Sequence, residues 1–289
     1  MTLRRFLLSG AVAVLCLALI GPSAPGGVLV AKPLPVDAAK DVVPNRVMTW
    51  NICNPCGRSQ NLGRAAEIAT YAPQVIGLQE ACVRDVEEIR RLLAGLYGLT
   101  YQVAYGPVLT SWGRCGGLPW RPGGYGQAIL SAAPISDRAN VEYPDGGSED
   151  RGYLSVTTTV DGRRVRVIDT HLAERRQEPV RARQARVLAR EIARHDRVIV
   201  IGDFNAVPYA PELGPVQALA TESDPACRAV FEGDCAPTTD WQSKFDYVFL
   251  RGVTAVAHRV RPSPYSDHHL FQSDVRIVTR AAPDAPRTP

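Results

Sequence analysis

The sequence contains only one long hydrophobic run, residues 6–20, and this run is shorter than the roughly 20 apolar residues of a membrane-spanning helix. The absence of a second run excludes a polytopic membrane protein. Internal repeats and a second change in composition are also missing, so we expect one large domain. The net charge is small, +4 over 289 residues. It does not by itself predict the clearly basic face that is typical of nucleic-acid binding.

The cysteines lack the spacing of a zinc site. Cys53 and Cys56 form one close pair, but no second pair or Cys-His cluster follows at the spacing of a zinc finger. Six cysteines remain outside the first 24 residues: Cys53, Cys56, Cys82, Cys115, Cys227 and Cys235. An even number favours disulfides in an oxidising compartment. The pairing stays open: Cys227 with Cys235 closes one loop, and the other four tie the early loops together.

The N-terminus has the pattern of an export signal. Arg4 and Arg5 precede the apolar run, and Pro22-Ser23-Ala24 supplies the small residues of a cleavage site. We therefore predict a signal peptide at residues 1–24 and a secreted protein, with an uncleaved N-terminal anchor as the alternative; the general and twin-arginine export routes both stay open. Composition predicts a Pro/Gly/Ala-rich linker at 25–44, a folded domain at 45–280 and a disordered tail at 281–289.

Short apolar runs alternate with amphipathic segments along the folded part. Strands are predicted at 46–52, 74–79, 100–105, 127–131, 151–160, 164–170, 197–201, 245–250, 253–260 and 270–278, and helices at 61–71, 83–96 and 178–195. Asp161-Gly162 predicts a hairpin, and residues 106–126 a long loop. Since helix-linked strands favour parallel pairing and hairpins antiparallel pairing, we expect an α/β (α+β) domain with two mixed sheets flanked by helices.

Polar residues stand at the ends of the predicted buried strands. The segments are Trp50-Asn51, Gln79-Glu80, Thr170-His171, Gly202-Asp203-Phe204-Asn205, Phe245-Asp246-Tyr247 and Ser266-Asp267-His268-His269. Ligand sites in α/β proteins favour such strand ends, where rigid elements direct side chains into one cleft. Mg²⁺ needs only one or two carboxylates together with substrate phosphate, and histidines handle protons. The pattern therefore predicts a metal-assisted phosphoester hydrolase, with Glu80 as the first metal ligand.

These six segments, in this order between Val47 and about Leu270, resemble the endonuclease/exonuclease/phosphatase superfamily, which includes pancreatic deoxyribonuclease. The segments at 202–206 and 266–269 carry most of the specificity, and Tyr125 to Ser131 and Arg151-Gly152 also resemble family segments. The resemblance implies a four-layer αββα sandwich of two mixed sheets flanked by helices. It makes 45–280 the catalytic domain.

The resemblance also implies a bound divalent cation. It places Mg²⁺, with Mn²⁺ or Ca²⁺ as alternatives, on Asn51, Glu80 and Asp267. It implies that His171 is an acid/base or phosphate-binding group.

Further roles follow from the same resemblance. Asp203 and Asn205 would orient the nucleophile and the phosphate, and Asp246 would orient and polarise His268. Arg151 is expected to contact a substrate phosphate.

The expected reaction is in-line attack of water on phosphorus, without a covalent enzyme intermediate. An extracellular nuclease or phosphodiesterase acting as a monomer, with a phosphodiester substrate and no obligate protein partner, is the first hypothesis. A lipid phosphodiesterase or phosphatase of the sphingomyelinase or phosphoinositide type is the second. A non-catalytic polyanion-binding module is the third, and its expected mark, loss of an essential side chain, is not visible in the sequence.

Two features stay outside this scheme. Arginines crowd one predicted helix and its approach, at Arg175, Arg176, Arg181, Arg183, Arg186 and Arg190. We expect them to form a solvated face; the alternative is a surface that binds polyanions. Trp112 and Trp120 in the long loop stack on a base, enter lipid or cover the core, and the sequence does not choose among these.

Overall fold

The structure of the protein is a computed structural model that describes residues 41–53, 60–227 and 235–278. The predicted signal peptide, most of the predicted linker, Cys56 and the predicted tail lie outside these residues. Strand β1 begins at Val43, two residues before the predicted domain boundary, because the Val43 N–H donates to the Ala72 carbonyl at 2.7 Å. None of the helices in the described part of the chain is long and apolar enough to span a bilayer.

The first sheet contains six strands in the order β13-β14-β1-β2-β6-β3. Their bounds are β1 (Val43–Asn51), β2 (Pro73–Cys82), β3 (Gln102–Thr110), β6 (Gly124–Ser131), β13 (Val253–Arg261) and β14 (Leu270–Ile277). β1 and β2 are parallel and the other neighbours are antiparallel. The parallel pair places the ends of β1 and β2 at the same edge of the sheet.

The second sheet has the order β11-β12-β10-β9-β8-β7. Its strands are β7 (Ser136–Glu142), β8 (Gly152–Val160), β9 (Arg163–His171), β10 (Val198–Asp203), β11 (Thr221–Glu222) and β12 (Asp246–Arg251). β9 and β10 are parallel, and the predicted hairpin joins β8 to β9. Asp161 and Gly162 both have positive φ, 51° and 65°, as the two central residues of a tight hairpin turn require.

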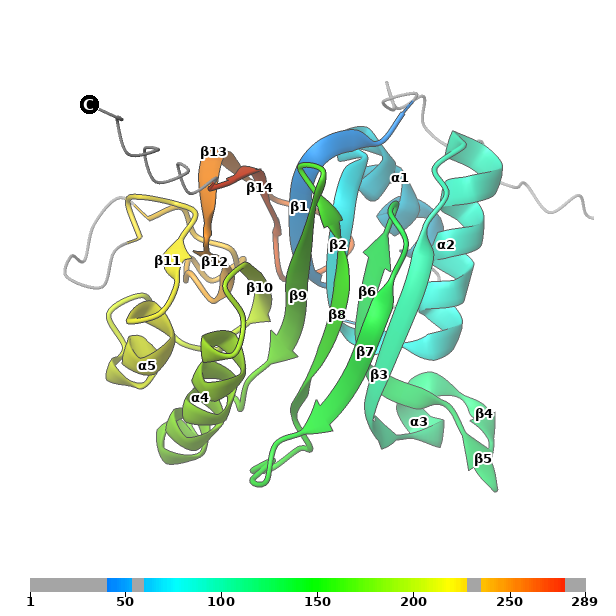
Figure 1. The fold of residues 1–289 in the computed structure, drawn as a ribbon. Coiled ribbons are helices and arrows are strands. Elements are labelled where there is room, and N and C mark those ends of the chain that lie inside the picture. The colour runs from blue at the N-terminus through cyan, green and yellow to red at the C-terminus, as the bar shows by residue number, and fades with distance from the viewer. Residues whose placement is uncertain (1–40, 54–59, 228–234, 279–289) are drawn as a thin grey trace, which may run out of the picture. The chain divides into compact units, whose positions relative to one another are not determined.

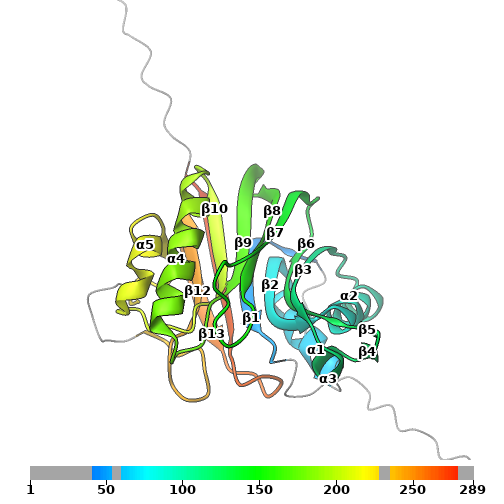
Figure 2. The same ribbon diagram turned by 90° about the horizontal axis from the view of Figure 1, so that it is seen from below.

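Helices cover the outer face of each sheet. α1 (Asn61–Tyr71) buries residues at the i, i+3, i+4, i+7, i+8 spacing of one helix face, and it packs with α2 (Val83–Tyr97) on the first sheet. On the second sheet lie α4 (Glu178–Ala193), a 3₁₀ turn (Pro211–Leu213) and α5 (Gly214–Gln217). Figure 2 shows the two sheets face to face between these two groups of helices.

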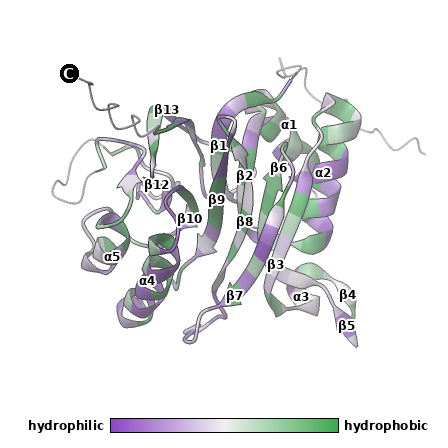
Figure 3. Cartoon of the chain, in the orientation of Figure 1, coloured by the Kyte–Doolittle hydropathy of each residue, from purple (hydrophilic) through white to green (hydrophobic). Residues whose placement is uncertain are grey.

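A third apolar core fills the space between the sheets. Val47 and Ile129 of the first sheet lie in the same cluster as Ile201 and Val248 of the second, and all four are fully buried. The central strands are correspondingly hydrophobic, whereas α4 is hydrophilic along much of its length (Figure 3). The predicted fold class, four layers with two mixed sheets inside, is confirmed.

Some elements differ from the prediction. The predicted long loop begins with the end of β3 and also contains α3 (Trp112–Cys115) and a two-stranded hairpin, β4 (Gly117–Leu118) with β5 (Arg121–Pro122), which extends from the body of the protein in Figure 1. Strand β7 was not predicted, because its side chains are mostly exposed and show no apolar alternation.

Disulfides stabilise two of the connections. Cys82 bonds Cys115, which ties α3 to the end of β2, and Cys227 bonds Cys235. Cys53 is also disulfide-bonded. The prediction of disulfides is therefore confirmed for these residues, and it includes the loop closed by Cys227 and Cys235.

Removing the Cys82–Cys115 disulfide is expected to cost more stability than removing Cys227–Cys235. The bonds span 33 and 8 residues. Loop-closure entropy of the unfolded chain then gives about 4 and about 2.5 kcal/mol respectively. Urea unfolding of the two double Cys→Ser variants measures the difference. An equal loss, or a larger loss for Cys227→Ser/Cys235→Ser, would contradict the entropic explanation.

Candidate active site

The strand ends of both sheets supply the polar residues of one site. In the second sheet, Asp203 at the end of β10 stands opposite His171 of β9 on one side and Asp246 of β12 on the other. In the first sheet, Asn51 ends β1 beside Gln79 of β2. Strand register alone therefore brings three titratable groups to one level of the second sheet.

Asp203 lies at the centre of the site. Its Oδ2 accepts a hydrogen bond from Asn51 Nδ2 at 3.1 Å, and it lies 3.4 Å from His171 Nε2 and 3.7 Å from His268 Nε2. The side chain is almost fully buried. Burial raises the pKa of Asp203 to about 7, and the neighbouring Asp246 adds to the rise while His268 opposes it. A carboxyl group with this pKa can exchange a proton near neutral pH.

His268 and Asp246 form a hydrogen-bonded pair next to Asp203. His268 Nδ1 lies 2.9 Å from Asp246 Oδ2, and the backbone N–H of Asp246 donates to Thr238 Oγ1. Burial alone would lower the pKa of His268, but the two carboxylates Asp246 and Asp203 raise it to about 10. This pair keeps a positive imidazolium beside the central carboxylate.

His171 is held in one tautomer by its neighbours. Its Nδ1 lies 3.0 Å from Arg151 Nη1. A guanidinium has no acceptor, so Nδ1 must accept and the ring proton must be on Nε2, which faces Asp203. Glu149 Oε1 lies 2.6 Å from Arg151 Nη1 and holds the guanidinium in place. Burial, Arg151 and His268 together place the pKa of His171 well below its usual value, so this ring is neutral.

Two of the site residues have left-handed backbone conformations. Glu80 has a φ of 52° and lies where the pairing of β2 with β6 shifts register, and Asn205 has a φ of 50°. Such conformations cost about 1–3 kcal/mol each in residues other than glycine and cluster at functional sites. The bulge directs Glu80 toward the ends of β1 and β10, where Asn51 Nδ2 donates to Glu80 Oε1 at 3.2 Å.

The donor set suits a hard cation. Glu80 offers a partly exposed carboxylate at the edge of the cluster, and Asp267 Oδ1 is buried without a hydrogen-bond partner among the described residues. A buried, unpartnered carboxylate oxygen is costly unless a cation or water meets it. Asp203, Asp246 and His268 also place ligand-type atoms within 4.8 Å of one another. Oxygen-rich surroundings of this kind favour Mg²⁺, Mn²⁺ or Ca²⁺ over softer metals.

Comparison with known proteins identifies the family. The model of the endonuclease/exonuclease/phosphatase family matches residues 48–268. The chain belongs to this family. It is therefore a metal-dependent phosphoric ester hydrolase, as the sequence predicted. Among curated protein sequences, none matches the chain.

Solved structures of the family share the fold. An endonuclease/exonuclease/phosphatase from Beutenbergia cavernae is 23% identical, with a TM-score of 0.65 over 80% of this chain and 71% of that chain. Danio rerio TDP2 complexed with a single-strand DNA product is 18% identical, with a TM-score of 0.63 over 80% and 98%. The human nocturnin catalytic domain with a bound sulfate anion is 23% identical, with a TM-score of 0.62 over 81% and 94%.

Most of the sequence-predicted site residues meet in this structure. Direct contacts join Asn51, Glu80, Arg151, His171, Asp203, Asn205, Asp246 and His268. Asp267 directly precedes His268 in the sequence, and its negative charge contributes to the raised pKa of His268. The candidate site is thus assembled from the strand ends of both sheets.

Sequence reasoning missed several contributors. Glu149, which orients Arg151, carries no motif signal. Ser266 belongs to the segment at 266–269, but the sequence predicted no function for it. Its hydroxyl donates to the Asn51 carbonyl at 2.7 Å and accepts from the His268 N–H at 3.1 Å, so it ties the first sheet to the histidine. Trp241 packs edge-on against the His268 ring at 5.4 Å between centroids. No pattern around Trp241 predicted this contact.

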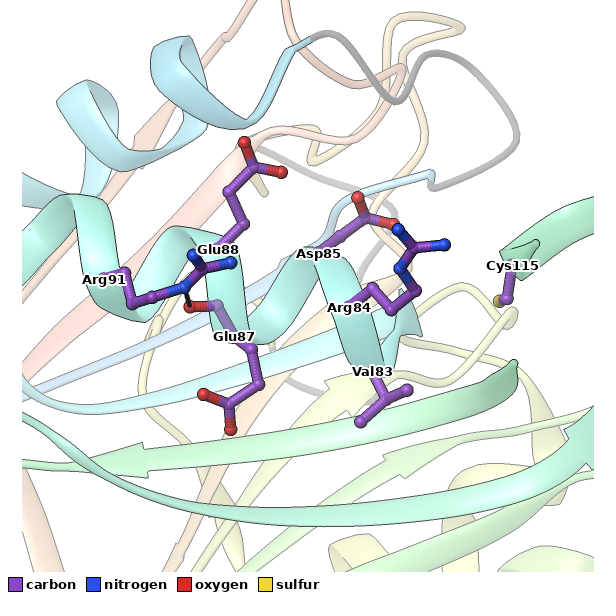
Figure 4. Close-up of a pocket in the computed structure, with 7 residues that line it drawn as sticks. All are labelled: Val83, Arg84, Asp85, Glu87, Glu88, Arg91 and Cys115. Carbon is purple, nitrogen blue, oxygen red and sulfur yellow. Dashed lines mark hydrogen bonds between the residues drawn. The ribbon is translucent and has the colours of Figure 1, made fainter. Parts of the chain in front are cut away.

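A separate hollow of about 440 Å³ lies beside the first turns of α2 (Figure 4). Several of its charged residues contact protein groups: Asn61 Nδ2 donates to both Asp85 and Glu88 at 2.8 Å, and Arg91 Nε donates to the Glu87 carbonyl. The bonds of Asn61 join α1 to α2. The hollow is thus explained by helix packing.

Proposed function

We propose that this family member is a secreted nuclease or phosphodiesterase that hydrolyses phosphodiesters by in-line attack of water. One observation carries the proposal: the buried Asp203 carboxylate is met within 3.7 Å by the Asn51 amide and by the His171 and His268 imidazoles. A carboxylate placed among proton-carrying rings is the arrangement that general acid–base catalysis requires. The disulfides are compatible with secretion.

Asp203 prepares the attacking water in this mechanism. With a pKa of about 7 it accepts the proton of the water near neutral pH. The Asp246–His268 pair supplies a fixed positive charge beside it, which stabilises the negative charge that develops at the phosphorus centre. Because Asp246 holds the ring by Nδ1, the Nε2–H of His268 stays directed into the site.

His171 and Asn205 bind the phosphate. The His171 ring presents Nε2–H as a donor because Arg151 occupies the other nitrogen. The Asn205 amide donates to the Leu172 carbonyl at 3.1 Å and lies beside the His171 ring. Two adjacent neutral donors suit the non-bridging oxygens of a phosphodiester. In this role Arg151 orients His171; its direct contact with a phosphate stays a prediction.

Glu80 and Asp267, with Asn51 orienting Glu80, would hold a divalent cation. Bound there, Mg²⁺, Mn²⁺ or Ca²⁺ supplies Lewis-acid stabilisation of charge on the phosphate oxygens and the leaving group.

Two substrate classes have support. A relative of the same fold, Danio rerio TDP2, was solved with a single-strand DNA product, which favours nucleic acid. A lipid substrate is the second candidate, because Trp112, Leu118 and Trp120 are 58%, 49% and 80% exposed on α3 and its hairpin. Their exposure shows that the two tryptophans do not cover the core. Exposed tryptophans of this kind either stack on bases or enter a bilayer interface.

The test is a substrate panel: single-stranded DNA, RNA, sphingomyelin vesicles, phosphoinositide and bis(p-nitrophenyl) phosphate, each with Mg²⁺, Mn²⁺, Ca²⁺ or chelator. We expect hydrolysis of bis(p-nitrophenyl) phosphate and of at least one nucleic acid, and loss of both with chelator. Activity on vesicles alone would replace the nuclease by the lipid phosphodiesterase. Activity that survives the chelator would refute the metal-assisted mechanism.

A further inference from the structure

A second hollow, of about 460 Å³, opens directly beside the phosphate-binding residues. Its lining residues are Glu174, Arg175, Arg176, Asn205, Trp241 and Phe245. Asn205 belongs to both places, since its amide contacts His171 Nε2 and its side chain also lines the hollow. The size is within the range of ligand sites and is enough for one nucleotide. A substrate held at Asn205 must therefore extend past this hollow.

Two arginines line the hollow without a partner among the residues that the structure describes. Arg175 and Arg176 are exposed and make no hydrogen bond or ion pair with any other residue in the described ranges. Their loop is nevertheless fixed: the buried Arg181 donates to the carbonyls of Ala173 and Glu174, at 3.2 and 2.7 Å. Arg181 is thus buried, which corrects the expectation that the arginines of α4 all form a solvated face. Two unengaged guanidinium groups on an anchored loop are prepared to bind an anion.

Two of the residues that line the hollow, Trp241 and Phe245, are aromatic. Trp241 is 46% exposed, and its ring makes T-shaped contacts with the rings of His268 and Phe245, at 5.4 and 6.1 Å between centroids. Its loop is anchored as well, because the Asp240 N–H donates to the Asp267 carbonyl at 3.0 Å and the His269 N–H to the Thr238 carbonyl at 2.8 Å. The exposed part of the indole therefore has a fixed position next to the catalytic histidine.

We propose that this hollow is a subsite for the nucleotide adjacent to the scissile phosphate, in which Trp241 stacks on the base and Arg175 and Arg176 bind the flanking phosphate. The inference rests on the proposed phosphodiesterase function and specifies its substrate as a nucleic acid strand. An acyl chain would need apolar walls, whereas the hollow holds two guanidinium groups and one carboxylate, Glu174. A base with its charged phosphate matches a lining that combines aromatic rings with guanidinium groups.

The experiment compares a fluorescent single-stranded oligonucleotide with bis(p-nitrophenyl) phosphate. For Arg175→Ala/Arg176→Ala we expect the ratio of kcat/KM for the oligonucleotide to that for the small substrate to fall by about tenfold or more, with a weaker salt dependence. Trp241→Ala should lower the ratio similarly, and Trp241→Phe should restore part of it. Binding in chelator, measured by anisotropy, should weaken in parallel.

A matched control removes the same charge elsewhere. Arg163 and Arg164, two exposed arginines at the start of β9, lie at the opposite end of the strand that ends in His171. Arg163→Ala/Arg164→Ala should keep the ratio and the affinity of the wild type. An unchanged ratio in Arg175→Ala/Arg176→Ala would overturn the subsite while leaving the phosphodiesterase intact.

Substrate chemistry separates the remaining outcomes. In one set of oligonucleotides, tetrahydrofuran replaces the base at one or the other of the two nucleotides that flank the scissile phosphate. At one of these two positions the replacement should weaken binding to the wild type but not to Trp241→Ala. Equal effects in both proteins would remove Trp241 from the subsite. If no substrate is hydrolysed with any metal, the proposed function fails, yet the anisotropy still decides whether Arg175 and Arg176 bind the strand.

Discussion

Replacing either Asp203 or His268 by alanine is expected to lower kcat by about 10²–10⁴-fold while the protein stays folded. In the proposed mechanism, Asp203→Ala removes the group that accepts the proton of the attacking water, and His268→Ala removes the positive charge 3.7 Å from that group. Both side chains lie at strand ends outside the three apolar cores. The measurement is steady-state hydrolysis of bis(p-nitrophenyl) phosphate with the preferred metal, together with circular dichroism of each variant.

The double variant sharpens this expectation. If the two groups act as one unit, Asp203→Ala/His268→Ala should be no slower than the slower single variant, because the effects of cooperating catalytic residues are not additive. His195 supplies the matched control: it is a partly exposed histidine that pairs with Glu191 on α4. His195→Ala should keep the wild-type rate. Near-normal rates in either single variant would refute the assigned roles.

The assembly of the site could be predicted because its residues are tied to strand ends. A run such as Val198 to Gly202 has to be buried, so the polar Asp203 that follows has to be at the edge of the sheet. Once β9 and β10 are parallel, His171 and Asp203 come into register without further information. The mixture of helix-linked strands and hairpins therefore predicted two mixed sheets. The polar segments, through the family resemblance that their order carries, predicted the four layers and the residues that meet.

Other features depend on contacts that leave no periodic signal. β7 pairs with β8 through its backbone, and its side chains carry no apolar pattern. Arg181 looked like one more charged residue on a helix surface, but Glu212, 31 residues later, comes to meet it in the core. Glu149 orients Arg151 only because the β7–β8 connection folds back on the site. A partner distant in sequence decides each case, and one sequence does not reveal it.

A buried ion pair behind the site gives the largest expected effect on stability. Lys244 Nζ lies 3.5 Å from Glu222 Oε1, with both side chains almost inaccessible, and 3.4 Å from the centre of the Phe271 ring. Burial raises the pKa of Glu222 to about 7 and lowers the pKa of Lys244, although each partner opposes the shift of the other. Removing either group is expected to destabilise the fold, because it leaves the charge of the other group buried and unpaired.

We expect Glu222→Gln and Lys244→Met each to lower the free energy of unfolding by about 3–5 kcal/mol. The double variant Glu222→Gln/Lys244→Met should lose less than either single variant, because it removes both charges and keeps the shape of the pair. Urea unfolding of the four proteins gives the coupling free energy. As a control, Arg90→Met breaks the exposed Arg90–Glu87 pair and should cost less than about 1 kcal/mol.

Additive losses in the double variant would mean that Lys244 and Glu222 do not depend on each other. The result also bears on catalysis, because Lys244 lies two residues before Asp246, whose negative charge raises the pKa of Lys244. If Lys244 stabilises only the fold, Lys244→Met should keep kcat at temperatures where it stays folded. A fall in kcat that the double variant does not restore would instead show that the buried ammonium tunes Asp246, and through it the His268 ring.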